Sequence, residues 1–295
     1  MRGRNRGGKF FICCNYTILF ITSLLCILPF IHLLAVSFSD SAAVSAGKVV
    51  FWPVNFTLKS YSFAFTSGKF VKALLISVLR VTLGCTVNLL LMVLTAYPLS
   101  KPKERLMGRN IYMIYFAATM IIGGGLIPTY LIVTRMGLLN SIWALILPSA
   151  LQVYNMVILM NFIRGLPEEM EEAAMIDGAG QGTILLKIVL PLMKPALATV
   201  GLFSIVSHWN DWFSGMIYMQ SPELYPLQTY LQGLLKSFED LMRSSGEDYM
   251  QLVSLMNART GRAAQLFLGA VPVMLIYPFL QKYFTEGLVL GSVKG

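Results

Sequence analysis

Charged residues are scarce in this chain. Asp, Glu, Lys and Arg make up 13% of its 295 residues, whereas 56% are hydrophobic. A soluble domain usually carries about 25% charged residues, and the mean hydropathy here is +0.67. The composition therefore excludes an ordinary soluble domain and indicates a polytopic membrane protein. The net charge of +9 is then explained by basic loops beside anionic lipid rather than by nucleic-acid binding.

Several functional patterns are also missing. Two histidines and four cysteines show neither metal-ligand spacing nor a disulfide framework, so no metal or cofactor is expected. The phosphate-binding pattern G-x-x-x-x-G-K-[ST] is absent, which excludes ATP hydrolysis by this chain itself. The apolar stretches carry no Asp/Glu/His relay of the kind that proton-coupled carriers use. No Ser/His or carboxylate constellation has catalytic spacing, so the chain is not expected to be an enzyme.

Long apolar stretches are what the sequence does contain. A helix needs about 20 mostly apolar residues to cross the hydrocarbon core. Six stretches meet this length and predict an all-α protein. They run at about 11–37, 73–99, 111–133, 142–162, 185–207 and 263–283. No small-residue cleavage site follows the basic N-terminus, so the first stretch is predicted to be an uncleaved span.

Some of these spans contain helix-breaking residues. Gly123, Gly124 and Gly125 interrupt the third span, and Pro148 lies in the fourth. Broken helices often line substrate paths, but they also arise from ordinary kinks and close packing. Arg80 lies within the second span, where we expect its side chain to extend to the interface.

Basic loops give the orientation. The N-terminal segment carries Arg2, Arg4, Arg6 and Lys9, and the loop "SKPKERLMGRN" carries four further Lys and Arg residues. Lys and Arg concentrate on the cytoplasmic side, and an even number of spans places both termini on one side. Both termini are therefore predicted to be cytoplasmic, as is the segment between spans four and five.

That segment predicts a short helix over 167–178. Pro167 begins it, and glutamates crowd its first turn, which favours helix initiation. Gly178 and Gly180 end it. The helix is too short to span a membrane, and its small alanines permit close approach of another surface. One helical face combines Met170, Ala173, Ala174 and Asp177.

The same segment carries the most specific pattern in the chain: E-A-A, three residues, G, nine residues, I-x-L-P. It is formed by Glu172, Ala173, Ala174, Gly178, Ile188, Leu190 and Pro191. This pattern resembles the cytoplasmic loop of permease subunits of binding-protein-dependent ABC importers. "GLIPTYLIVTRMGLLNSIWALILPSA", "PLMKPALATVGLFSIVSHWNDWFSGMIYM" and "YFTEGLVLGSVKG" resemble the carbohydrate branch, on the maltose-permease second-subunit side. Within that branch the chain is most similar to the subgroup for polysaccharide-derived oligosaccharides, including uronate-containing ones.

The resemblance implies a type I ABC importer permease fold with six spans, forming a single transmembrane domain over 1–295. Its parts are the N-terminal span 11–37, core spans over 73–283 and a cytoplasmic coupling helix over 167–178. It implies a second permease subunit, two ABC ATPase subunits and an extracytoplasmic solute-binding protein as partners. Coupling to an ATPase is then carried by Asp177 together with the seven residues of the pattern.

A candidate sugar path lies at the end of span five, in "SHWNDWFSGMIYM". Aromatic faces bind the C–H surfaces of sugars and polar side chains bind their hydroxyls, and the same region contributes to the sugar site in maltose-type relatives. The path residues are Trp209, Asn210, Asp211, Trp212 and Tyr218. An aromatic belt at the membrane interface is the alternative for this cluster.

The sequence thus predicts a multi-pass plasma-membrane permease subunit of a bacterial ABC importer that translocates a carbohydrate. An ABC permease for a non-sugar solute shares the cytoplasmic loop and is one alternative. A secondary carrier is the other, since hydropathy alone allows it. The "GLVLGSVKG" and "HWNDWF" segments favour sugar.

Overall fold

A computed structural model describes residues 6–66, 68–244, 259–276 and 278 of the chain. The described residues form helices of several kinds and no β-strand. The chain divides into two compact units, residues 1–71 with 231–271 and residues 72–230 with 272–295. Each unit is described below by itself. The single domain over 1–295 stays a prediction.

The first unit is built on the long helix α1 (Arg6–Ser37). Two short helices follow, α2 (Ser41–Ser45) and α3 (Lys59–Thr66). A small cluster of buried side chains at the end of α1 holds this region together: Ala35, Ala43, Val44 and Val49. Part of the helix over 259–276 also belongs to this unit. The Ser41 and Thr260 hydroxyls lie 3.1 Å apart and share a hydrogen bond.

The second unit is organised around α4 (Lys69–Ser100), to which α7 and α11 contribute a shared core. Met92 and Ala96 of α4 are fully buried in this core with Leu159 of α7 and Val200 of α11. The other elements of the unit are α5 (Arg109–Ile121), α6 (Leu126–Arg135), η1 (Ile142–Leu145), η2 (Leu147–Ser149), α7 (Val153–Arg164), α8 (Glu168–Ile176), α9 (Gln181–Ile184), η3 (Leu185–Val189), α10 (Leu190–Leu192), α11 (Lys194–Asn210), α12 (Phe213–Tyr218) and η4 (Pro222–Leu224). The helix α13 (Leu227–Ser244) begins in this unit and continues into the first.

Two helices among the described residues are long and apolar enough to cross a membrane unbroken, Phe11–Ser37 and Lys69–Ser100. Three further spans are possible if bent pairs of helices each count as one. These pairs are Arg109–Ile121 with Leu126–Arg135, Ile142–Ser149 with Val153–Arg164, and Gln181–Leu192 with Lys194–Asn210. The sixth predicted span is helical from 259 to 276. Most of its remainder lies outside the described residues.

The predicted breaks are confirmed in spans three and four. α5 and α6 meet at 113° around the three glycines, and the fourth span bends by 52° after the segment that contains Pro148. Span five, predicted at about 185–207, also bends, by 80° between α10 and α11, and no break was predicted at this position. Pro191 and Pro195, which flank this bend, remove backbone donors there and give the physical reason.

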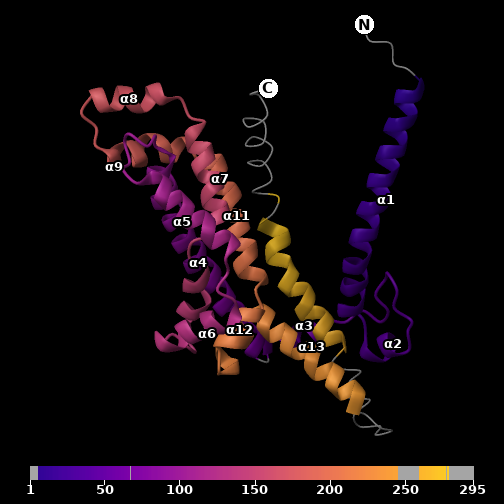
Figure 1. Ribbon diagram of the computed structural model, residues 1–295. Coiled ribbons are helices and arrows are strands. Elements are labelled where there is room, and N and C mark those ends of the chain that lie inside the picture. The colour runs from indigo at the N-terminus through magenta and orange to yellow at the C-terminus, as the bar shows by residue number, and fades with distance from the viewer. Residues whose placement is uncertain (1–5, 67, 245–258, 277, 279–295) are drawn as a thin grey trace. The chain divides into compact units, whose positions relative to one another are not determined.

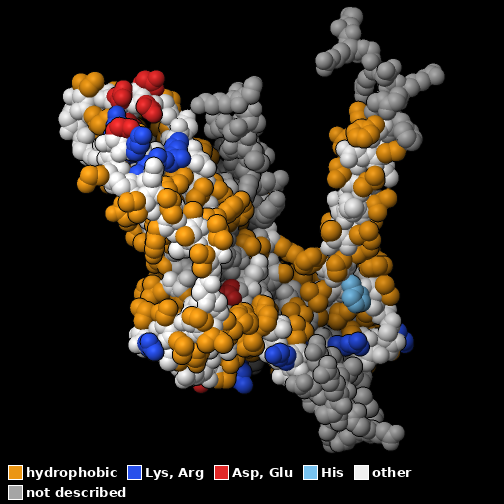
Figure 2. Space-filling model, in the orientation of Figure 1, with side chains coloured by type: hydrophobic (Ala, Val, Ile, Leu, Met, Phe, Trp, Pro, Cys, Tyr) orange, Lys and Arg blue, Asp and Glu red, His pale blue; other side chains and the backbone are white. Residues whose placement is uncertain are grey.

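Charge is distributed unevenly over the second unit. Figure 2 shows acidic and basic side chains gathered at the end that carries α8, while hydrophobic side chains cover the middle of the unit. Figure 1 places α8 and α9 at this end, with α6 and α12 at the opposite end of the same unit. The apolar middle has the surface expected of helices in a hydrocarbon environment.

Candidate functional site

The short polar helix predicted over 167–178 is present as α8, from Glu168 to Ile176. Pro167 occupies its N-cap, one position earlier than predicted, and three glutamates lie in its first turn. Their charges interact favourably with the positive end of the helix. Asp177 caps the helix after Ile176, and Gly178 follows with φ of +79°. This left-handed conformation favours glycine, so Gly178 ends the helix as predicted.

The base of α8 is fixed to the end of α4 by a group of four residues that we call the α8 anchor: Tyr97, Lys101, Glu171 and Gln181. Lys101 forms an ion pair with Glu171, and the two side chains are only 11% and 14% exposed. Lys101 Nζ also lies 4.1 Å from the centre of the Tyr97 ring, a cation–π contact. The Tyr97 hydroxyl donates to Gln181 Oε1 at 2.8 Å. The anchor therefore joins α4, α8 and α9 through largely desolvated contacts.

The two sides of α8 differ. Ala174 and Met175 pack against the core of the unit. No residue of α8 is buried, and Ile176 is 86% exposed. Met170, Ala173 and Asp177 are exposed as well. Ala174 was predicted on the same face as these three, but it lies on the inner side because the anchor at Glu171 sets the rotation of the helix.

The rest of the sequence pattern lies away from α8. Ile188 belongs to η3, and Leu190 and Pro191 to α10. Leu190 packs against the core, whereas Pro191 is exposed. Glu172 on α8 meets Arg105 at 3.5 Å, and both side chains are well exposed. Exposed ion pairs contribute little to stability, so this pair adds little to the anchor.

The predicted sugar-path residues are separated by the fold. α11 ends at Asn210 and α12 begins at Phe213, so the helix is interrupted within this cluster. Asn210 and Trp212 are exposed, but Trp209 is 4% exposed and Tyr218 6%. The Tyr218 ring stacks on Tyr130 at 6.2 Å between ring centres. Of the aromatic residues proposed for the path, Trp212 alone offers an open surface.

Asp211 is paired with Arg80. The Arg80 side chain is 1% exposed, and its guanidinium donates to the Asp211 carboxylate and, at 2.8 Å, to the Asp211 carbonyl. A further bond at 3.3 Å reaches the Leu145 carbonyl. The prediction that Arg80 extends to the interface is therefore wrong. The fold supplies a carboxylate and two carbonyls inside the unit, which compensate for the loss of water around the guanidinium.

A second polar link joins α4 to α11 two turns further along. Asn88 Oδ1 and His208 Nε2 lie 2.9 Å apart and share a hydrogen bond, and the Asn88 amide donates to the Ser149 carbonyl at 3.0 Å. Asn88 is fully buried and His208 is 3% exposed. Gly84 lies between the two links, directly against the His208 ring. Arg80, Gly84 and Asn88 are four residues apart, so all three lie on one face of α4.

Sequence reasoning missed both the anchor and these links. Polar residues at Arg80 and Asn88, with Gly84 between them, are a helix-periodic signal for a buried polar face. That signal was available in the sequence. The partners on α11 and at η1 and η2 were not, because they depend on tertiary packing. Among the described residues no group of three His, Cys, Asp or Glu is placed to hold a metal ion.

These features define a class of protein: a helical membrane transport subunit with broken spans and an anchored polar helix at one end. Residues 16–289 match the model of the family described as "Binding-protein-dependent transport system inner membrane component". The chain belongs to this family. The predicted identification as a permease subunit of a binding-protein-dependent importer is confirmed, and the chain is a transport permease located in a membrane.

Individual relatives agree with this assignment. The chain is 39% identical over 288 residues to the polygalacturonan/rhamnogalacturonan transport system permease protein YtcP of Bacillus subtilis, covering 98% of this chain and 99% of that protein. It is 36% identical over 290 residues to protein LplC of the same organism, covering 98% and 97%. Among solved structures it is similar to a chain from a bacterial ABC transporter involved in the import of the acidic polysaccharide alginate. The TM-score is 0.86 at 30% identity, covering 96% of this chain and 100% of that chain.

Proposed function

We propose that this chain is the permease subunit through which an ABC importer passes an oligosaccharide into the cytoplasm, and that α8 receives the movement of an ATPase partner. Import of carbohydrate is the activity that the names of YtcP and of the alginate importer support. The partners are ABC ATPase subunits, a second permease subunit and an extracytoplasmic solute-binding protein. Both termini and α8 then lie on the cytoplasmic side.

The α8 anchor is the observation that carries the coupling role. A helix that transmits force must be accessible to its partner and firmly joined to its own chain. Ile176, Met170 and Ala173 are exposed, while Lys101 and Glu171 are largely buried beneath them. A largely buried charge pair resists separation, because removing one partner leaves the other desolvated. Displacement of α8 is therefore passed to α4 rather than absorbed in a flexible loop.

The substrate class follows from the relatives. YtcP is named for polygalacturonan and rhamnogalacturonan, and the solved structure for alginate. We infer that the cargo here is an oligosaccharide derived from a polysaccharide. Asn210 and Trp212 are the residues of the predicted path that remain exposed, and they combine an amide with an aromatic face. Asp211, Trp209 and Tyr218 act instead by holding this region in place.

The coupling role is tested with the assembled importer. Ile176→Arg and Ala173→Arg each introduce a long cation on the exposed face of α8 without touching the anchor. Each should weaken ATPase binding about tenfold or more, the effect of altering a central interface residue. ATPase retention on immobilised permease and sugar uptake into vesicles are the measurements.

Met107→Arg is the matched control. Met107 is 94% exposed in the loop before α5 and lies on the same predicted side as α8. It carries a large apolar side chain like Ile176, but it lies outside α8. The same change at Met107 should therefore leave ATPase binding unaltered. Wild-type ATPase retention in both α8 variants would contradict the coupling role while leaving carbohydrate import itself untouched.

A further inference from the structure

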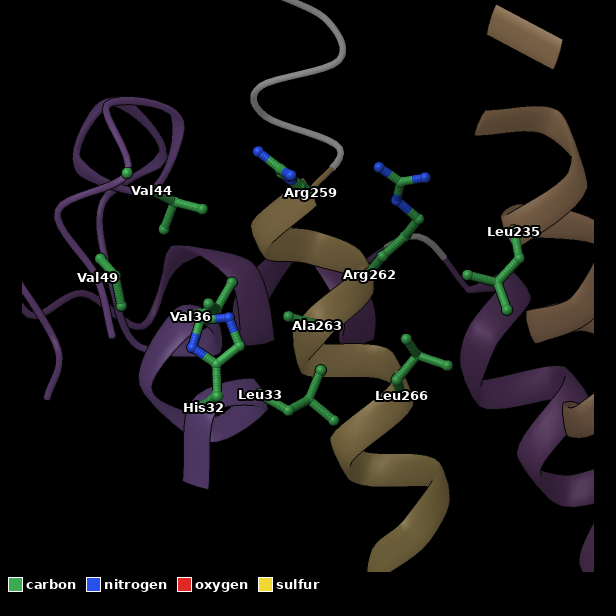
Figure 3. A pocket seen from close by; sticks show the side chains of 11 residues that line it. His32, Leu33, Val36, Val44, Val49, Leu235, Arg259, Arg262, Ala263 and Leu266 are labelled. Atoms are coloured by element: carbon green, nitrogen blue, oxygen red, sulfur yellow. The ribbon is translucent and has the colours of Figure 1, made fainter. Parts of the chain in front are cut away.

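Arginine side chains come together at two places in the molecule. In the first unit, Arg259 and Arg262 line a cavity of about 390 Å³ whose wall is mostly aliphatic (Figure 3). Arg262 already takes part in another interaction of the fold, so this cavity does not define a ligand site. In the second unit, Arg109 and Arg164 meet at the end of α4. This second pair, which we call the arginine pair, has the features of a binding site.

Three helices bring the arginine pair together. Arg109 is the first residue of α5, Arg164 is the last residue of α7, and Leu99 lies one residue before the end of α4. Arg109 Nε donates to the Leu99 carbonyl at 3.0 Å, and a terminal nitrogen of Arg164 donates to the same oxygen at 3.1 Å. Because they share one acceptor, these two nitrogens are about 6 Å apart or less. A single phosphate group can therefore contact both guanidiniums.

The arginine pair keeps an excess of positive charge. The shared carbonyl is one of the last four of α4, which have no partner within the helix, and α7 also ends at this point. Each helix end carries about half a negative elementary charge, so the two ends balance roughly half of the charge on two guanidiniums. Among the described residues, the acids of α8 that form ion pairs bind Lys101 and Arg105, and no ion pair includes either member of the arginine pair. An anion between the two guanidiniums is therefore favoured.

The arginine pair lies where the polar end of the second unit meets its apolar middle. Arg164 is exposed and Arg109 is half-buried, so a ligand can reach both. Figure 2 shows basic side chains between the acidic side chains at the α8 end and the hydrophobic side chains of the middle. Tyr112 and Tyr115 follow Arg109 at intervals of three residues, so each neighbours the one before on the surface of α5. Both are more than half exposed, and exposed tyrosines are typical of the interface between headgroups and hydrocarbon.

We propose that Arg109 and Arg164 bind the phosphate of an anionic phospholipid, whose glycerol and first acyl carbons lie along Tyr112 and Tyr115. The excess positive charge favours a lipid of net negative charge over phosphatidylcholine. A hydrated free phosphate gains nothing from the aromatic surface, whereas a lipid uses both parts of the site. By the predicted orientation this lipid belongs to the cytoplasmic leaflet. The proposal does not depend on ATPase binding or on the identity of the sugar.

The test uses the complete importer in phosphatidylcholine nanodiscs that contain a photoreactive phosphatidylglycerol with its diazirine close to the glycerol. Labelling should map to the peptide of α5 that contains Tyr112 and Tyr115. The double variant Arg109→Gln/Arg164→Gln should lower labelling of this peptide by about thirtyfold, the effect of removing two arginines from an anionic surface. A photoreactive phosphatidylcholine of the same design should label the peptide weakly in the parent and in the double variant.

A second variant leaves the arginine pair and its bonds to α4 in place. Tyr112→Glu puts a negative charge beside the proposed phosphate, so it should lower labelling by about tenfold. Tyr112→Gln is the matched neutral control and should retain most of the labelling. Arg135 is an exposed arginine at the end of α6, on the opposite predicted side of the membrane, and Arg135→Gln should leave labelling unchanged. Intact assembly of each variant is checked by gel filtration.

Three results would overturn the proposal. The first is labelling at the parent's level in the double glutamine variant or, where that variant does not assemble, in Tyr112→Glu. The second is complete loss of labelling on addition of millimolar inorganic phosphate, which would identify a site for soluble anions. The third is a double variant that no longer retains the ATPase while lipid labelling persists, which would identify a protein-docking surface.

Discussion

Gly84 permits the His208 ring of α11 to lie directly against α4, and a single methyl group there should have a large effect. A Cβ at this position would lie 2.6 Å from His208 Nε2 and 2.8 Å from two carbons of the ring. Real Cβ atoms do not approach other atoms so closely, so the imidazole or the helix must move. The ring is 3% exposed and has little room to do so. Gly84→Ala should therefore displace His208 from Asn88.

The magnitude combines two costs. Overpacking of a filled interior typically costs about 1–3 kcal/mol. Loss of the bond between His208 and Asn88 leaves buried polar groups unsatisfied, at about 1–3 kcal/mol more. We expect Gly84→Ala to destabilise the protein by about 2–6 kcal/mol. For a chain of this size the apparent melting temperature should fall by roughly 3–10 °C.

Gly201→Ala is a matched control, because Gly201 is also a buried helical glycine in the same unit. A Cβ at Gly201 would meet Leu89 at 3.8 Å, an ordinary contact. Alanine is the better helix former, by about 1 kcal/mol. This variant should be neutral or slightly more stable. The assay is thermal unfolding of the purified importer. All variants are heated by the same protocol, and aggregation is followed by gel filtration.

The reasoning is refuted if the Gly84→Ala variant has the same melting temperature as the parent protein. It is refuted equally if the double variant Gly84→Ala/His208→Ala is less stable than His208→Ala alone. Removal of the imidazole removes the obstacle, so the added methyl group should then cost nothing. This second comparison separates a specific clash with His208 from a general intolerance of alanine in α4.

The remaining predictions concern the sugar path and the orientation. Asp211→Asn should destabilise the protein by about 3 kcal/mol in the same melting assay, because it leaves the buried Arg80 charge without its carboxylate. Asn210→Ala, at an exposed position, should keep the parent's melting temperature but lower sugar uptake at saturating binding protein. If Asn210→Ala instead lowered only the melting temperature and Asp211→Asn lowered only uptake, Asn210 would be the structural residue and Asp211 the path residue. In a variant without the native cysteines, Gln220→Cys should react with an impermeant thiol reagent in intact cells. Gly180→Cys should react only after permeabilisation, and both positions are exposed. The opposite labelling pattern would invert the orientation and remove α8 from the cytoplasm.

The sequence predicted most of the backbone architecture because its signals are local. Long apolar runs predicted the spans, three consecutive glycines predicted the break between α5 and α6, and Pro167 with Gly178 bounded α8 to within two residues. The bend between α10 and α11 was missed, since prolines are common in membrane helices and do not always bend them. Pro98 shows this, because it lies inside the unbroken helix α4.

The site was predicted less completely, for a different reason. Composition and spacing identified α8, but the rotation of α8 about its axis follows from the ion pair of Glu171 with Lys101. In the sequence, Lys101 indicated only the orientation of the chain in the membrane. Asp211 was predicted to line the path, whereas its carboxylate pairs with Arg80, 131 residues away. A residue's chemistry does not reveal which long-range partner will use it. The hydrogen-bonding requirement of a buried guanidinium makes such a partner necessary, but it does not identify that partner in advance.

α4 connects the two halves of the proposed mechanism. Lys101, beyond its last residue, belongs to the α8 anchor, and Arg80 on the same helix holds Asp211 at the end of α11. The two positions are 21 residues apart, about 31 Å along an α-helix. α4 is unbroken from Lys69 to Ser100, so its two ends move together as one element. In the proposed mechanism, movement of α8 by an ATPase would therefore shift the backbone that carries Asn210 and Trp212. Each contact along this route is largely buried and is either charged or hydrogen-bonded. Partial separation of such a contact already loses most of its interaction free energy, so the contact is either formed or broken. Such contacts favour a switch between two discrete states over gradual deformation.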